Sequence, residues 1–105
     1  MADRTYILNK VKETVLSFDG GAEIVLFGSQ ARGNAQPDSD WDFLILSETD
    51  FDYKQKREIR NSIHLIELQT GEIFSIIIHN KNYWNRAQNV ITPFFKNVER
   101  ESITI

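Results

Sequence analysis

The residues best suited to chemistry are two aspartates, Asp40 and Asp42, which are separated by one residue at the start of an apolar run. Side chains alternate along a strand, so both carboxylates are expected on one face, with Trp41 and Phe43 turned toward the core. Two neighbouring carboxylates repel each other unless a positive charge lies between them. A divalent cation such as Mg²⁺ removes that repulsion, since it takes one or two carboxylates together with water and substrate phosphates. The spacing therefore predicts a metal site.

A phosphate-binding turn is the expected complement to these carboxylates. Gly28 and Ser29 follow the apolar run 23–27. A glycine lets the backbone approach a ligand closely, and the amides together with the serine hydroxyl can bind phosphate oxygens. Arg32 adds a planar charged group suited to phosphate, and Ser39 directly precedes the aspartates.

Each of these features alone is typical of an ordinary turn or of a solvated strand end. The complete order is more specific: a strand, Gly-Ser, an arginine, a polar loop, Ser-Asp-x-Asp and a second strand. We therefore interpret the string from residue 28 to residue 42 as one phosphate- and metal-binding constellation.

The elements that must position these residues follow from apolar periodicity. Ile7, Val11 and Val15 recur at helical spacing, which predicts a helix that starts after Asp3 and runs to about residue 17. The apolar runs 23–27 and 41–46 predict strands, joined by a polar loop that has room for a helical turn.

The second half of the chain continues the alternation of helix and strand. Ile59, Ile63 and Ile66 lie at near-helical spacing, and the run that ends at His79 is rich in β-branched residues. The further elements that we expect are a helix at 54–68, a strand at 72–79, short helices at 80–88 and 92–102, and a short edge strand at 103–105. In the helix at 92–102, Thr92 is the expected N-cap and Pro93 lies in the first turn. This order predicts a single domain over residues 1–105 of the α/β (α+β) class, with a small mixed sheet flanked by helices.

Composition narrows the functional classes. The 105 residues are 41% hydrophobic and 26% charged, with a net charge of −3, so no general basic field would attract nucleic acid. The absence of cysteine excludes disulfides, thiolate metal sites and a cysteine nucleophile. No segment has the length or apolarity of a signal core or a membrane span, and we expect a cytoplasmic protein with no membrane partner.

The string "GSQARGNAQPDSDWDFLIL", residues 28–46, resembles the signature of the DNA polymerase beta-like nucleotidyltransferase superfamily. Within it, the chain is similar to the small bacterial minimal nucleotidyltransferases of the antitoxin type. The segments "NKNYW" and "FFKNVERESITI" resemble the closing part of those proteins. The resemblance covers nearly the whole chain, and it is strongest over residues 28–46.

The resemblance implies an acidic site on a mixed sheet and the transfer of a nucleoside monophosphate from an NTP to a hydroxyl. Carried over by position, Gly28 and Ser29 would hold the triphosphate, Asp40 and Asp42 would bind Mg²⁺, and Arg32 would assist with phosphate or the local loop. The expected substrate is ATP. The best-known family arrangement adds a partner, a helical HEPN-type toxin on which a tyrosine receives AMP.

The sequence departs from the family pattern at one position. The family commonly has a third carboxylate on the next strand of the site, and counting back from "NKNYW" that position falls on Ser75. Glu72 lies three residues earlier, so alternation turns it to the opposite face. Glu67 lies on the preceding helix and is not placed by the pattern.

Two functions remain open on this basis. The first is a metal-dependent nucleotidyltransferase, and the second is a nucleotide-binding interaction module that neutralises a partner by contact. A small-molecule transferase acting on aminoglycosides is less consistent with the chain, because those enzymes carry an additional domain for the drug. The sequence leaves the acceptor, the base, the number of metals and homo-oligomer formation open.

Several other residues have structural explanations that we favour. His64 and His79 have no metal-ligand spacing to each other, and the basic run 54–60 is typical of a solvated helix face. The aromatic residues near the end of the chain are expected to pack on the sheet, with a partner surface as the alternative: Tyr83, Trp84, Phe94 and Phe95.

Overall fold

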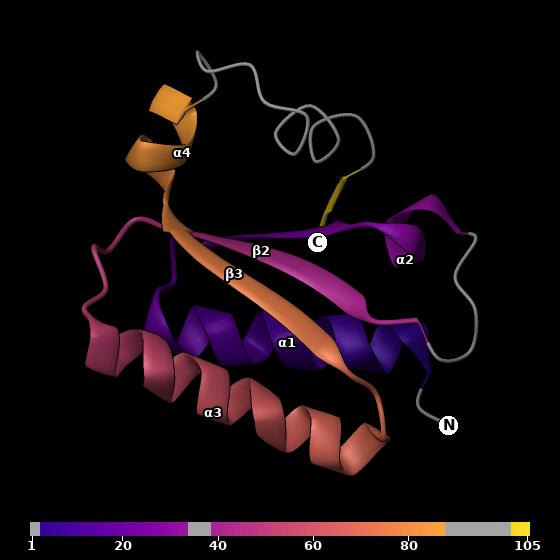
Figure 1. Cartoon of the computed structure of the whole chain (residues 1–105). Coiled ribbons are helices and arrows are strands. Elements are labelled where there is room, and N and C mark those ends of the chain that lie inside the picture. Colours follow the sequence, from indigo (N-terminus) through magenta and orange to yellow (C-terminus); the bar gives the residue numbers. More distant parts are fainter. Residues whose placement is uncertain (1–2, 34–38, 88–101) are drawn as a thin grey trace.

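A four-stranded mixed sheet forms the centre of the computed structural model, which describes residues 3–33, 39–87 and 102–105 (Figure 1). The strands are β1 (Glu23–Phe27), β2 (Trp41–Ser47), β3 (Phe74–Asn80) and β4 (Ile103–Thr104), in the order β3-β2-β1-β4. β1 is antiparallel to β2 and to β4, whereas β2 and β3 are parallel. The predicted small mixed sheet and its short edge strand are confirmed.

Two long helices cover one face of this sheet. They are α1 (Arg4–Phe18) and α3 (Tyr53–Thr70), which lie side by side beneath the strands in Figure 1. The short helix α2 (Ser29–Arg32) follows β1, and α4 (Lys81–Ala87) rises on the opposite side of the sheet. Within the described residues, each of these helices occurs where the sequence predicts helical structure. The predicted helix at 92–102 falls almost entirely outside the described residues.

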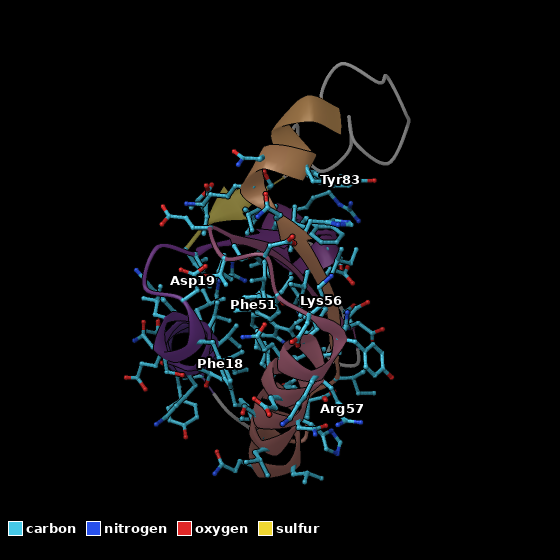
Figure 2. The ribbon with its side chains drawn as sticks, turned by 90° about the vertical axis from the view of Figure 1, so that its left-hand side faces the viewer. Phe18, Asp19, Phe51, Lys56, Arg57 and Tyr83 are labelled. Atoms are coloured by element: carbon cyan, nitrogen blue, oxygen red, sulfur yellow. The ribbon has the colours of Figure 1, made fainter. Side chains whose placement is uncertain are left out.

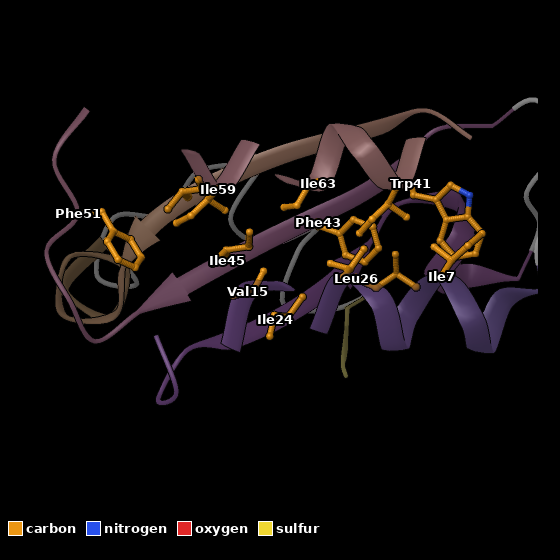
Figure 3. Packing of buried hydrophobic residues seen from close by; sticks show 13 residues of the cluster. Ile7, Val15, Ile24, Leu26, Trp41, Phe43, Ile45, Phe51, Ile59 and Ile63 are labelled. Atoms are coloured by element: carbon orange, nitrogen blue, oxygen red, sulfur yellow. The ribbon is translucent and has the colours of Figure 1, made fainter. Parts of the chain in front are cut away.

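The main core fills the space between the sheet and the two long helices (Figure 3). The predicted helical stripe of α1 is fully buried there, as are the isoleucines of α3. Because side chains alternate, the odd-numbered β2 residues Trp41, Phe43 and Ile45 join this core, as expected for the first two. A smaller cluster lies on the other face, where Trp84 of α4 packs with Val25, Leu44 and Leu46.

Local signals set the ends of α3. The Asp52 side chain accepts a hydrogen bond from the Gln55 N–H at 2.8 Å, while the Gln55 side chain accepts from the Asp52 N–H at 3.0 Å, which forms a capping box. Gly71 ends the helix with a φ of 74°, in the left-handed region that suits glycine. The helix therefore begins and ends within two residues of its predicted bounds.

β3 has a neighbouring strand on one side only within the described residues. The Ile73 carbonyl accepts from the Trp41 N–H and so faces β2, which turns the Ile76 carbonyl to the outer side by alternation. The Arg60 guanidinium donates to that Ile76 carbonyl at 2.9 Å. A charged side chain of α3 therefore occupies part of the open edge.

Two expectations from the sequence need correction. β3 begins at Phe74 rather than at residue 72, and the Glu72 side chain accepts a hydrogen bond from the Trp41 indole N–H at 3.2 Å.

Tyr83 is 55% exposed, so it is not a core residue, whereas Trp84 is buried as expected. Adjacent residues on a short helix face different directions, and only one of the two can face the sheet. Phe94 and Phe95 lie outside the described residues. No helix in the described ranges is long and apolar enough to cross a membrane.

Candidate functional site

The glycine–serine turn and the aspartates lie against each other. Asp42 is paired with Phe27, the last residue of β1, so its carboxylate lies beside the turn that follows. A Cβ added to Gly28 would collide with Oδ2 of Asp42. The φ of 76° and ψ of −158° at Gly28 are also a conformation that only glycine adopts readily. The fold thus brings together the two halves of the predicted constellation.

The turn itself presents backbone N–H groups. The Gly28 carbonyl accepts from the N–H groups of Ala31 and Arg32 at 3.1 and 3.2 Å, and the Ser29 carbonyl accepts from Gly33 at 3.1 Å. The N–H groups of Ser29 and Gln30 precede these bonds and have no carbonyl partner within the helix. Together with the half-buried Ser29 hydroxyl, they form a group of donors that suits a phosphate.

A contact from α1 braces this turn. The Arg4 guanidinium donates a hydrogen bond to the Gln30 carbonyl at 2.9 Å. It also lies 5.8 Å from the ring centre of Trp41, the residue between the two aspartates in the sequence. The Gln30 side chain in turn donates to the Ser39 carbonyl at 3.4 Å. Sequence reasoning missed Arg4 and Gln30, because no local pattern connects residues that lie so far apart in the chain.

The two aspartates have different environments. Asp40 is exposed and directly precedes β2, while Asp42 is partly buried within the strand. Burial raises the pKa of the Asp42 carboxyl, the negative charge of Asp40 raises it further, and the positive charge of Arg32 opposes both. The expected repulsion between neighbouring carboxylates is therefore present, and Arg32 relieves it only in part.

A hard divalent cation fits this donor set. Two neighbouring carboxylates whose repulsion is not fully neutralised are the protein ligands that Mg²⁺ commonly uses, and the exposed Asp40 leaves room for water and phosphate oxygens. No cluster of three or more histidine, aspartate or glutamate ligands occurs among the residues that the structure describes. A cation at this position would therefore depend on the substrate for much of its coordination.

Ser75 lies beside Asp42 on the neighbouring strand. The parallel register of β2 and β3 pairs the two residues directly, so both side chains lie on the same face of the sheet. Neither nearby glutamate replaces a carboxylate there. Glu72 contacts Trp41 at the core side, and Glu67 accepts from the Phe74 N–H at 2.9 Å at the start of β3.

The two histidines lie away from this site. His64 is exposed on α3, and its Nδ1 is 3.0 Å from the Glu67 carboxylate. His79 is partly buried near the far end of β3, where its ring contacts those of Tyr83 and Trp84. Burial lowers the pKa of the His79 imidazole, and the positive charge of Lys56 lowers it further.

Comparison with known proteins places this architecture in a family. Residues 8–102 match the nucleotidyltransferase domain family. A protein of Methanocaldococcus jannaschii named "Putative protein adenylyltransferase" is 33% identical over 79 residues, which are 75% of this chain and 72% of that protein.

Two solved structures share the fold. One, described as "Structure of putative minimal nucleotidyltransferase", has a TM-score of 0.60 and 26% identity, covering 95% of this chain and 94% of the other. Another, described as "Crystal structure of the toxin-antitoxin with AMP-PNP", has a TM-score of 0.63 and 16% identity, covering 91% of this chain and 69% of that one. The family match spans most of the sequence, and the chain is a member of the nucleotidyltransferase domain family.

Proposed function

We propose that this protein transfers AMP from Mg²⁺-bound ATP to a hydroxyl group of a protein partner. The observation that carries the proposal is the contact between the Gly28 backbone and the Asp42 carboxylate, which joins a phosphate-binding turn to an acidic pair. The name of the relative from M. jannaschii supports adenylyl transfer to protein. ATP as the substrate is also consistent with the structurally similar toxin–antitoxin, whose crystal structure is one with AMP-PNP.

In this proposal each residue has a separate task. The N–H groups of Ser29 and Gln30 and the Ser29 hydroxyl bind oxygens of the triphosphate, and Arg32 contributes positive charge. Asp40 and Asp42 hold Mg²⁺, which when bound neutralises charge that develops on the phosphates. Ser39 is proposed as a nucleotide contact, since its carbonyl is linked through Gln30 to the turn.

The transfer has a simple balance of bonds. The acceptor oxygen forms a bond to the α-phosphorus of ATP, and the bond from that phosphorus to the β-phosphate bridging oxygen breaks. Pyrophosphate leaves with the bonding electrons, and the acceptor hydroxyl proton passes to water. Donors fixed in advance around the phosphates favour this reaction, because they stabilise charge without reorganising during the step.

The proposed acceptor is a tyrosine of a HEPN-type helical toxin. Resemblance to the antitoxin-type minimal nucleotidyltransferases supports this partner, and so does the shared fold with a structure of a toxin–antitoxin. We propose that residues 1–105 act as one catalytic domain in the cytoplasm, with the partner supplying the acceptor.

Ser75 favours a second candidate function. The residue paired with Asp42 lacks a charge, so the site has two acidic side chains where the family commonly has three. A site of this kind can bind a metal–nucleotide while activating an acceptor poorly. The protein would then neutralise its partner by contact, and the nucleotide would serve binding rather than transfer.

Calorimetric titration of Mg²⁺-ATP and of each other NTP, with pyrophosphate release measured in the same samples, tests the proposal. We expect metal-dependent binding to wild type, strongest for ATP, and its loss in the Asp40→Ala/Asp42→Ala variant. With a co-expressed HEPN-type partner, pyrophosphate release should fall by about 10²-fold or more in that variant. The Glu13→Ala/Glu58→Ala variant removes two exposed helix charges and is the matched control.

The outcomes separate the two candidates. Partner-dependent pyrophosphate release that requires Asp40 and Asp42, and that rises in Ser75→Asp, supports the enzyme. Nucleotide binding without release, with neutralisation of the partner retained in Asp42→Ala, supports the contact module. Absence of nucleotide binding by the wild type would overturn both uses of the site.

A further inference from the structure

A hollow lies at the far end of the sheet from the candidate active site. Its volume is about 580 Å³, and its lining residues come from the β2–α3 loop, α3, the end of β3 and α4: Asp50, Lys56, His79, Asn80, Asn82 and Tyr83. A volume of this size accommodates a small organic ligand. None of these residues belongs to the constellation of residues 28–42.

The length of the parallel strands β2 and β3 separates the hollow from the acidic pair. Asp42 pairs with Ser75 at one end of the parallel strands, and Ser47 pairs with Asn80 at the other. At about 3.3 Å per residue, five residues place the two ends roughly 16 Å apart. The buried Trp84 and Leu44 occupy the face between them. The hollow is therefore a separate place on the molecule.

Two polar side chains at the hollow have no hydrogen-bond partner among the described residues. They are the ammonium of Lys56 and the imidazole of His79, and neither has a carboxylate within ion-pair distance in that part of the chain. Figure 2 shows Lys56 and Tyr83 on the same side of the molecule, reaching it from α3 and α4. A positive charge is thus available to an anionic group.

An aromatic surface lies beside that charge. The Tyr83 ring is 5.3 Å from the His79 ring, and the His79 ring is stacked 5.9 Å from the buried Trp84. Tyr83 is 55% exposed, so part of its ring is open to a planar ligand. The Asn82 amide and the Asp50 carboxylate add a donor and acceptors at the rim, suited to the edge of a base or to sugar hydroxyls.

We propose that this hollow binds a mononucleotide, with Lys56 at the phosphate and the Tyr83 ring against the base. The site is independent of the proposed catalytic one, because it shares no residue with it. A positive charge, an exposed aromatic ring and amide groups around one hollow match the phosphate, the face of the base and the polar edge of the base in such a ligand. The chain would then carry two nucleotide sites at opposite ends of one sheet.

Titration of AMP into the Asp40→Ala/Asp42→Ala variant tests the second site alone. Adding Lys56→Ala should weaken AMP binding about tenfold or more, and adding Tyr83→Ala should weaken it about fivefold. Arg57→Ala is the matched control, because Arg57 is the next residue on α3 and does not line this hollow. We expect AMP affinity within twofold of the parent in that control, and thermal melting confirms that each variant is folded.

Two further probes, adenosine and inorganic phosphate, test the contacts to the base and to the phosphate separately. Adenosine should bind more weakly than AMP and should respond to Tyr83→Ala but not to Lys56→Ala, whereas inorganic phosphate should respond to Lys56→Ala alone. Chemical-shift changes of the His79 ring and Asn82 side-chain amide on addition of AMP would place the ligand.

No binding of AMP to the Asp40→Ala/Asp42→Ala variant would overturn the proposal. An equal loss of AMP affinity in Lys56→Ala and Arg57→Ala would also overturn the proposal, because the loss would then reflect the overall positive charge of α3 rather than a contact from Lys56. Neither result bears on the catalytic proposal, which is tested by pyrophosphate release from the protein with Asp40 and Asp42 intact.

Discussion

Gly28 and Asp42 illustrate, at the scale of single residues, how closely the site is packed. Asp42 stands against the Gly28 backbone, where burial raises the pKa of its carboxyl and the nearby Asp40 adds to the effect. A carboxyl whose pKa is raised on folding destabilises the fold when it is ionised. The ionised Asp42 therefore opposes folding, and a metal–nucleotide bound there would relieve the repulsion.

Gly28→Ala should destabilise the fold by about 1–3 kcal/mol and should remove nucleotide binding. The alanine would have to adopt a φ of 76°, and its Cβ would push the Asp42 carboxylate away. Urea unfolding and Mg²⁺-ATP titration measure the two effects. Gly20→Ala is the control, because Gly20 has no atom within 4 Å of an added Cβ and does not have a positive φ. Equal stability of the two variants would contradict the prediction.

Asp19 connects elements at the end of the sheet away from Asp42. It follows α1, and its nearly buried carboxylate accepts hydrogen bonds from the N–H groups of Gly21, Glu48 and Thr49 at 2.8–2.9 Å. These bonds, led by that from Thr49, lower the pKa of the Asp19 carboxyl despite its burial. One side chain, labelled in Figure 2, thus joins the turn before β1 to the loop after β2 through these hydrogen bonds.

Asp19→Asn should lower the free energy of unfolding at pH 7 by about 2–3 kcal/mol, because the amide can no longer accept all three bonds. The pKa is lowered on folding, so the stability contributed by Asp19 is present above the unfolded value and is lost as pH falls through the folded value. Urea unfolding at several pH values should therefore show that the difference in free energy of unfolding between the wild type and Asp19→Asn becomes smaller as the pH falls.

Asp3→Asn is the control for this variant. Asp3 is exposed at the start of α1, and its side chain makes no capping hydrogen bond. Its substitution should have little effect at any pH. A difference for Asp19→Asn that stayed constant down to pH 2 would show that the carboxylate charge is not responsible.

Local patterns predict most of the elements but fewer of the contacts between them. The stripe of Ile7, Val11 and Val15 predicts α1, because burial of one helix face leaves a regular signal. The strand start at Phe74 and the exposure of Tyr83 depend on which neighbours the fold supplies, and they were predicted incorrectly. The pairing of Ser75 with Asp42 agrees with the position counted from the sequence, while the site roles of these residues stay predictions.

The whole molecule has polar groups at both ends of one apolar sheet. Asp42 lies at the start of β2, and Asp19 binds the Glu48 and Thr49 N–H groups beyond its end. Burial and the charge of Asp40 raise the pKa of the Asp42 carboxyl, while hydrogen bonds lower the pKa of the Asp19 carboxyl. The two carboxylates therefore contribute to stability with opposite dependence on pH, and core residues separate them.

Asp42→Asn and Asp19→Asn should change stability independently. At pH 7 the first should raise the free energy of unfolding, because it removes a carboxylate that opposes folding, and the second should lower it. The double variant should equal the sum within about 0.5 kcal/mol, as for distant sites without shared partners. Urea unfolding of the four proteins measures the cycle, and a larger deviation would indicate coupling along the sheet.

The contact between Arg60 and the Ile76 carbonyl has a consequence for how copies of this chain meet in concentrated solution. β3 is rich in isoleucine and has an open outer side within the described residues, and such strands readily extend into intermolecular sheets and fibrils. A guanidinium that already occupies a carbonyl on that side puts charge in the path of an incoming strand and removes one acceptor that it would need. We therefore expect Arg60 to disfavour aggregation through β3, the strand that also carries Ser75.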